Sequence, residues 1–90
     1  MYKIKDYTYN QAMKYGVIVL PSKKKNKKID VYDKDLNYLV SIGDIRYKDF
    51  PSYLESHSKG HALKRRDLYH SRHKNYKKGT AGWYAKNLLW

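Results

Sequence analysis

The stretch IDVYDKDLNYLVSI, residues 29–42, decides the fold because apolar and polar side chains alternate on both sides of a central turn. Ile29 and Val31 fall on one face of an extended chain, since successive strand side chains point to opposite faces. Tyr38, Val40 and Ile42 repeat this alternation, and the intervening DKDLN, residues 33–37, is composed of turn-forming residues. The pattern predicts a β-hairpin.

Before this hairpin, the sequence predicts a short helix and a further strand. Residues 8–15 favour a helix that Thr8 caps and that Gly16 ends in a left-handed conformation. The β-branched run VIVL, residues 17–20, stops at Pro21 and predicts a strand. Because the run is continuously apolar, we expect this strand to be buried on both faces, either centrally or against the helices.

After the hairpin, helical signals dominate. Pro51 suits the first turn of a helix, and residues 61–76 favour a helix that Gly60 interrupts, so we expect one broken helix or two consecutive ones. Thr80 can cap a last helix, whose apolar stripe comprises Ala81, Tyr84, Ala85, Leu88 and Leu89. The predicted fold is α+β: a short N-terminal helix, a three-stranded antiparallel sheet, then two or three helices, in a single domain spanning residues 1–90.

Composition limits the function. The formal charge is +12, and residues 57–90 hold nine Lys or Arg against Asp67 alone, so a polyanion is the expected partner. Hydrophobic residues make up 41% of the chain, which is too many for a solvated tail. The absence of cysteine excludes disulfides and thiolate chemistry. No apolar run approaches the ~20 residues of a bilayer span, and we expect a soluble, non-secreted protein without membrane contact.

Two basic segments are candidate binding sites. The first, SKKKNKK at residues 22–28, predicts an exposed loop between strands, either merely solvated or able to grip phosphates. Its lysines are Lys23, Lys24, Lys25, Lys27 and Lys28. The second, RRDLYHSRH at residues 65–73, places several basic and aromatic side chains on one helical face, and Lys77 and Lys78 follow it. That face comprises Ala62, Arg65, Arg66, Tyr69, Arg72, His73 and Tyr76.

Guanidinium groups around a tyrosine ring match phosphate or carboxylate oxygens, so we expect this face to point outward and hold an external anion. In the alternative, Tyr69 and Tyr76 enter the core, and the arginine heads bond to Asp44, Asp49 or helix carbonyls. Trp83 and Trp90 are expected in the core rather than stacked on bases.

Metal and enzyme sites are less favoured. The pairs His57/His61 and His70/His73 have helical ligand spacing, but the neighbouring arginines would repel a dication. We predict no metal and no cofactor. No nucleotide-binding or hydrolase motif is present, and a metal-independent nuclease that uses His70 or His73 as base is a third hypothesis.

Four segments, PSKKKNKKIDVYD, SIGDIRYKDFPSYL, RRDLYHSRH and KGTAGWYAKNLLW, occur here in this order. In them the chain resembles a family of small uncharacterised basic proteins encoded by large nucleocytoplasmic DNA viruses of algae and protists. It departs from the family pattern at Leu36 and Arg46, where glycine is usual. The resemblance implies a virion component or genome-associated factor, in the virion or the infected host cell.

The leading hypothesis is therefore a non-enzymatic viral protein that binds a polyanion, namely the backbone of DNA or RNA without base-specific readout. The runner-up is a minor capsid or cement protein that contacts acidic capsid surfaces. Oligomeric state is left open by the sequence.

Overall fold

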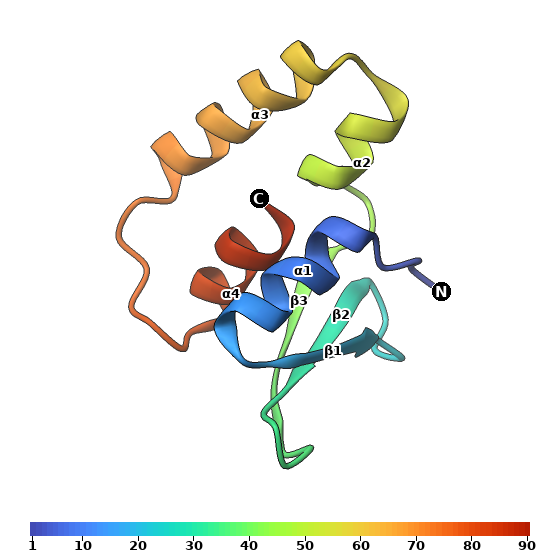
Figure 1. The fold of residues 1–90 in the computed structure, drawn as a ribbon, viewed down its shortest axis with the longest axis vertical. Helices are drawn as coiled ribbons and strands as arrows, with labels where there is room; N and C mark the ends of the chain where they lie inside the picture. The colour runs from blue at the N-terminus through green and yellow to red at the C-terminus, as the bar shows by residue number, and fades with distance from the viewer.

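The computed structural model describes residues 1–90 and contains four helices around one small sheet (Figure 1). The elements are α1 (Asp6–Tyr15), β1 (Ile18–Pro21), β2 (Lys27–Tyr32), β3 (Tyr38–Asp44), α2 (Phe50–Ser56), α3 (Lys59–Arg72) and α4 (Ala81–Leu89). One helix, three strands and three helices therefore follow one another along the chain. This order confirms the predicted α+β class.

The three strands form one antiparallel sheet in which β2 lies between β1 and β3. Ile29 pairs with Ile42, which confirms the predicted hairpin. The VIVL run forms the predicted strand and packs against α1, but the expectation of burial on both faces was wrong, because β1 is an edge strand and only one of its faces is covered. Val19 is buried under the helices, whereas its neighbour Leu20 is 47% exposed.

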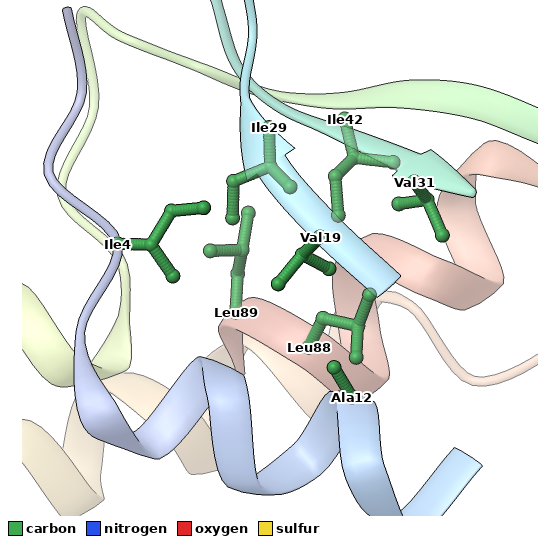
Figure 2. Packing of buried hydrophobic residues seen from close by; sticks show 8 residues of the cluster. All are labelled: Ile4, Ala12, Val19, Ile29, Val31, Ile42, Leu88 and Leu89. Carbon is green, nitrogen blue, oxygen red and sulfur yellow. The ribbon is translucent and has the colours of Figure 1, made fainter. Parts of the chain in front are cut away.

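The core lies between this sheet and the helices α1 and α4 (Figure 2). Its buried members are Ile4, Ala12, Val19, Ile29, Val31, Ile42, Leu88 and Leu89. The last two come from α4 and Tyr84 and Ala85 pack beside them, so the predicted apolar stripe docks on the core except at Ala81, which is exposed. Thr8 of α1 donates its hydroxyl proton to the carbonyl oxygen of Leu88 at 2.8 Å, which satisfies a buried polar group and joins the two helices.

The first helix begins earlier than its sequence signals predicted. It starts at Asp6, with Lys5 in the N-cap position, so the prediction that Thr8 caps it was wrong. Thr8 is fully buried and its hydroxyl serves α4 instead. The C-terminus is as predicted: Gly16 has φ +69°, and the next residue, Val17, donates its N–H to the Ala12 carbonyl at 3.0 Å.

The predicted long helix is two helices, α2 and α3, that pack against each other. The helix is interrupted at residues 57–58 rather than at Gly60, which lies in the first turn of α3. Asp49 caps α2 by accepting from the Ser52 N–H, and Thr80 caps α4 as predicted. Because α3 ends at Arg72, Tyr76 lies outside the helix, and its predicted place on the helical face was wrong.

The hairpin turn contains an unusual backbone conformation. Leu36 has φ +64°, which places a branched side chain in the left-handed region that glycine favours. Asp33 holds the turn by accepting from the N–H groups of Asp35 and Asn37, both at 2.9 Å. Leu36 is therefore the position at which the turn sequence conflicts most with the turn geometry.

Candidate anion-binding cleft

The largest cavity is a cleft of about 540 Å³ that opens between α3, α4 and the segment joining β3 to α2. Its aromatic lining comprises Tyr47, Tyr53, Tyr69 and Trp90, with the imidazole of His73 beside them, and its cationic lining comprises Lys28, Lys48, Arg65 and Arg72. Its one carboxylate belongs to Asp44. The cleft thus combines positive charge with flat apolar rings.

Two of the three arginines of α3 line this cleft, and none of the three pairs with a carboxylate. The Arg65 guanidinium lies 5.6 Å from the centre of the Tyr53 ring, and its buried Nε has no hydrogen-bond partner. Arg72 is exposed at the end of the helix. Arg66 does not line the cleft, because its guanidinium lies 4.6 Å from the Phe50 ring.

The predicted arginine face is therefore divided. Arg65 and Arg66 are half-buried against aromatic rings, contrary to the expectation that all three arginines point freely outward. The alternative is also wrong in part, since Asp44 and Asp49, the expected partners, bond to other cations. The guanidinium charges remain without a carboxylate partner in the folded chain.

A column of stacked rings supports the α3 side of the cleft. Tyr69 lies between Trp90, at 4.5 Å between ring centres, and His73, at 4.1 Å. Tyr76 continues the column and bonds to His73 Nδ1 through its hydroxyl at 2.6 Å. Burial raises the pKa of Tyr69 to about 12, and the nearby Tyr76 hydroxyl adds to the rise. Tyr69 is thus a structural ring whose two faces are both covered.

Gly82 explains how the segment after α3 returns to α4. The Tyr76 ring lies directly against Gly82, and a Cβ atom at that position would overlap three ring atoms. Ring stacking and this close approach together fix residues 73–76 against α4. Tyr76 therefore helps to hold the aromatic column although it lies beyond the helix.

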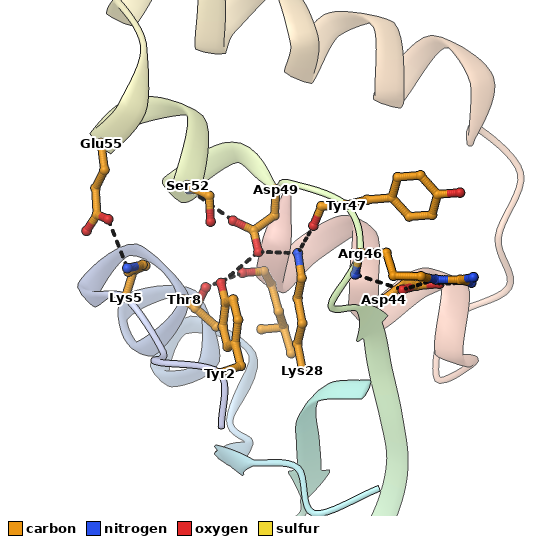
Figure 3. A network of polar contacts seen from close by, with 11 residues as sticks. Tyr2, Lys5, Thr8, Lys28, Asp44, Arg46, Tyr47, Asp49, Ser52 and Glu55 are labelled. Atoms are coloured by element: carbon orange, nitrogen blue, oxygen red, sulfur yellow. Dashed lines mark hydrogen bonds and ion pairs between the residues drawn. The ribbon is translucent and has the colours of Figure 1, made fainter. Parts of the chain in front are cut away.

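Lys28, which lines the cleft, belongs to a buried ion pair (Figure 3). Lys28 Nζ lies 2.8 Å from Asp49 Oδ2 and donates to the Tyr47 carbonyl oxygen at 2.6 Å. Asp49 also accepts from the Tyr2 hydroxyl at 2.6 Å and from the Ser52 N–H at 3.0 Å. Burial acts to raise the pKa of Asp49, but the hydrogen bonds and charge of Lys28 outweigh it, and the pKa is lowered.

This network overturns the expectation for Lys28. The residue lies in β2 rather than in the exposed loop, and its side chain is only 5% exposed. Its charge is compensated by Asp49, so it is not free for an external anion. Asp44 is likewise compensated, because Arg46 bonds to it at 2.6 Å and thereby lowers the pKa of Asp44 to about 2. Because each pair joins one positive and one negative side chain, neither pair adds to the net charge of the cleft.

The remaining lysines of the first basic segment do not line the cleft, although Lys27 lies in β2 rather than in the loop and pairs there with Asp44 of the cleft. Lys23, Lys24, Lys25 and Lys27 are all exposed, and Lys24 Nζ donates to the Tyr38 hydroxyl at 2.6 Å. In Figure 1 this loop and the segment that joins α3 to α4 lie on opposite sides of the molecule. Lys77 and Lys78 are exposed in that joining segment. The predicted site residues thus form two separate basic surfaces.

The histidines are distributed between two places. His57 and His61 stack on each other with ring centres 4.5 Å apart, near the break between α2 and α3. His73 belongs to the aromatic column, and His70 has a buried Nε2 without a hydrogen-bond partner. No three His, Asp or Glu side chains are grouped as metal ligands.

Sequence reasoning did not identify Tyr47, Lys48 and Tyr53 as cleft residues. Tyr47 and Lys48 lie in the irregular segment 43–50, where no periodic pattern indicates which side chains point together, and Tyr53 lies in the short helix α2 that follows. Trp90 was expected in the core; it is half-buried and packs against the core cluster, and its ring also stacks on Tyr69 at the edge of the cleft.

Comparison with protein-family models, with curated protein sequences and with solved structures gives no match for this chain. None of the four helices is long and apolar enough to cross a membrane.

Proposed function

We propose that this chain is a non-enzymatic protein that binds the phosphate backbone of nucleic acid through surface cations, without reading the base sequence. The observation that carries the proposal is the lack of carboxylate partners for Arg65 and Arg72 at a cleft. Only three of the 20 Lys and Arg residues form ion pairs within the chain. An external polyanion would compensate the remainder.

Two surfaces would share this work. The cleft offers guanidinium groups, which hold phosphate oxygens with two parallel hydrogen bonds. The lysine loop, residues 22–26 between β1 and β2, offers ammonium groups on flexible side chains. Because Lys27, which follows the lysine loop, pairs in the sheet with Asp44 of the cleft, one strand of nucleic acid would contact both surfaces. The setting we propose is a large DNA virus, where the protein would act in the virion or in the infected cell.

The test is the affinity of the purified protein for a labelled random duplex, measured by fluorescence anisotropy at low and physiological salt. The variant Arg65→Gln/Arg72→Gln removes two cleft charges and keeps a polar side chain with the first three carbons of arginine, although the Arg65 guanidinium no longer lies over the Tyr53 ring. The matched control is Lys59→Gln/Lys64→Gln, which removes the same charge from the same helix outside the cleft. We expect weaker binding for the arginine variant than for the control.

Equal losses of duplex affinity in the two variants would show that the cleft has no special part in binding and that only the overall positive charge matters. No affinity for duplex or single strand, even at low salt, would contradict the proposal as a whole. In that case a contact with acidic capsid proteins would be the better account of the charge.

A further inference from the structure

The cleft contains more than phosphate binding requires. Surface cations alone suffice for the backbone of a double helix, whose bases are stacked inside and cannot reach a protein ring. Here the cations surround a cavity of about 540 Å³ with aromatic walls. That volume falls within the range of about 300–1,000 Å³ typical of small-ligand sites. The cleft is therefore large enough to admit a single flat group, but not a duplex.

Tyr47 is the cleft ring left free to stack. Its side chain is 68% exposed, and its only aromatic or cationic contact is the Arg46 guanidinium at 5.8 Å from the ring centre. Tyr69, by contrast, is covered on both faces by Trp90 and His73. Figure 3 shows the Tyr47 ring extending away from the buried ion pair. A ring in this position offers a platform for a planar ligand.

The backbone beneath this ring is fixed. Lys28 Nζ donates to the Tyr47 carbonyl at 2.6 Å, and the Tyr47 N–H donates to the Asp44 carbonyl at 3.1 Å. Because Lys28 is itself held by the buried Asp49, the platform is tied to the centre of the fold. A fixed platform lowers the entropy lost when a ligand is ordered on it.

Cations that could hold a phosphate line the same cavity. Arg65 has an unpartnered Nε, Arg72 is exposed at the helix end, and Lys48 has only a long hydrogen bond of 3.3 Å to Ser56 Oγ. None of them pairs with a carboxylate. A nucleotide joins a phosphate to a planar base through a sugar, so it carries both of the groups that this lining could hold.

We infer that the cleft binds one unpaired nucleotide of a single strand, with its base stacked on Tyr47 and its phosphate held by Arg65, Arg72 and Lys48. This inference rests on the proposed function and narrows it, because it makes the single strand the preferred polyanion. Backbone contacts at the lysine loop would add affinity without distinguishing single strand from duplex. The same nucleotide chemistry is offered by a free mononucleotide, and the experiment separates the two sources.

The experiment measures binding of four probes: a short oligothymidylate, a duplex of equal length, inorganic polyphosphate and AMP. Trp83→Phe leaves Trp90, at the cleft, as the only tryptophan, so its fluorescence reports occupancy. Tyr47→Ala removes the platform, and Tyr9→Ala, an exposed tyrosine on α1, is the matched control. We expect Tyr47→Ala to weaken oligothymidylate binding by about five- to 150-fold and to leave duplex and polyphosphate binding unchanged.

Three outcomes would overturn the inference. Equal binding of oligothymidylate, duplex and polyphosphate, unchanged in Tyr47→Ala, would leave the proposed function standing without a nucleotide site. Binding of AMP but of no oligonucleotide would assign the cleft to free nucleotides and exclude the strand. Failure of every probe to bind would contradict the proposed function together with the inference.

Discussion

Replacing Asp49 with serine should destabilise the fold severely, because the change leaves the Lys28 ammonium buried without its counter-charge. Lys28 and Asp49 have side-chain exposures of 5% and 1%. Breaking such a pair costs about 3–5 kcal/mol, while serine retains the ability to cap α2. The free energy of unfolding expected for 90 residues is roughly 5–13 kcal/mol, so much of it would be lost. Urea unfolding followed by circular dichroism measures the effect.

A double variant makes the reasoning refutable. Lys28→Met/Asp49→Ser removes both charges. We expect its free energy of unfolding to lie within about 2 kcal/mol of the wild-type value and well above that of Asp49→Ser. Glu55→Gln breaks the exposed pair with Lys5 and should cost at most about 1 kcal/mol. If Asp49→Ser costs no more than Glu55→Gln, or if the double variant is no more stable than the single one, the ion pair is not what organises this region.

The same pair predicts the direction of acid unfolding. Burial acts to raise the pKa of Asp49, but the hydrogen bond and charge of Lys28, together with the hydrogen bonds from Tyr2 and Ser52, outweigh burial, so the folded-state pKa lies below its ordinary value of about 3.9. Its contribution to stability is therefore complete above about pH 4 and is lost as the pH falls through the folded-state pKa. In Lys28→Met, burial still acts to raise the pKa of Asp49, but the charge and hydrogen bond of Lys28 that lower it are gone. Acid unfolding of this variant should therefore begin at a higher pH. An unchanged acid midpoint would contradict this account of the Asp49 pKa.

Three further predictions concern backbone and ring packing. Leu36→Gly should raise the free energy of unfolding in urea by about 0.5–1 kcal/mol, because relief of the left-handed backbone strain exceeds the entropic cost of ordering glycine. The control Asn26→Gly, also at positive φ, should change stability less. Gly82→Ala should lower stability and alter near-ultraviolet circular dichroism by displacing Tyr76, although alanine ordinarily stabilises a helix. Burial raises the pKa of Tyr69 to about 12, so the stability that its neutral form contributes should be complete below about pH 10 and lost as the pH rises through 12. In Tyr69→Phe the loss of stability at alkaline pH should be smaller.

The parts of the fold predicted correctly are those with local physical signals. The hairpin follows from two-residue alternation around a turn, and Gly16 and Thr80 act at helix ends as their chemistry predicts. The errors concern partners that are distant in sequence. Nothing local distinguishes Lys28 from the lysines before it, and its burial depends on Asp49, which lies 21 residues away.

The candidate site was predictable only in part for the same reason. The arginines of α3 were identified from their spacing, but the half-burial of Arg65 and Arg66 depends on rings contributed by α2, at Tyr53 and Phe50. The cleft itself arises because α3 packs along α2 and approaches α4 through the Tyr69–Trp90 stack. No periodicity within a single element encodes that arrangement.

The most direct test of the central claim is the salt dependence of nucleic-acid binding in wild type and in Arg65→Gln/Arg72→Gln. If these guanidinium groups neutralise phosphates, the slope of log Kd against log salt concentration should fall by about 1.5–2 in the variant, while Lys59→Gln/Lys64→Gln changes it less. A slope that is identical in wild type and in the arginine variant would show that the cleft cations never meet a phosphate.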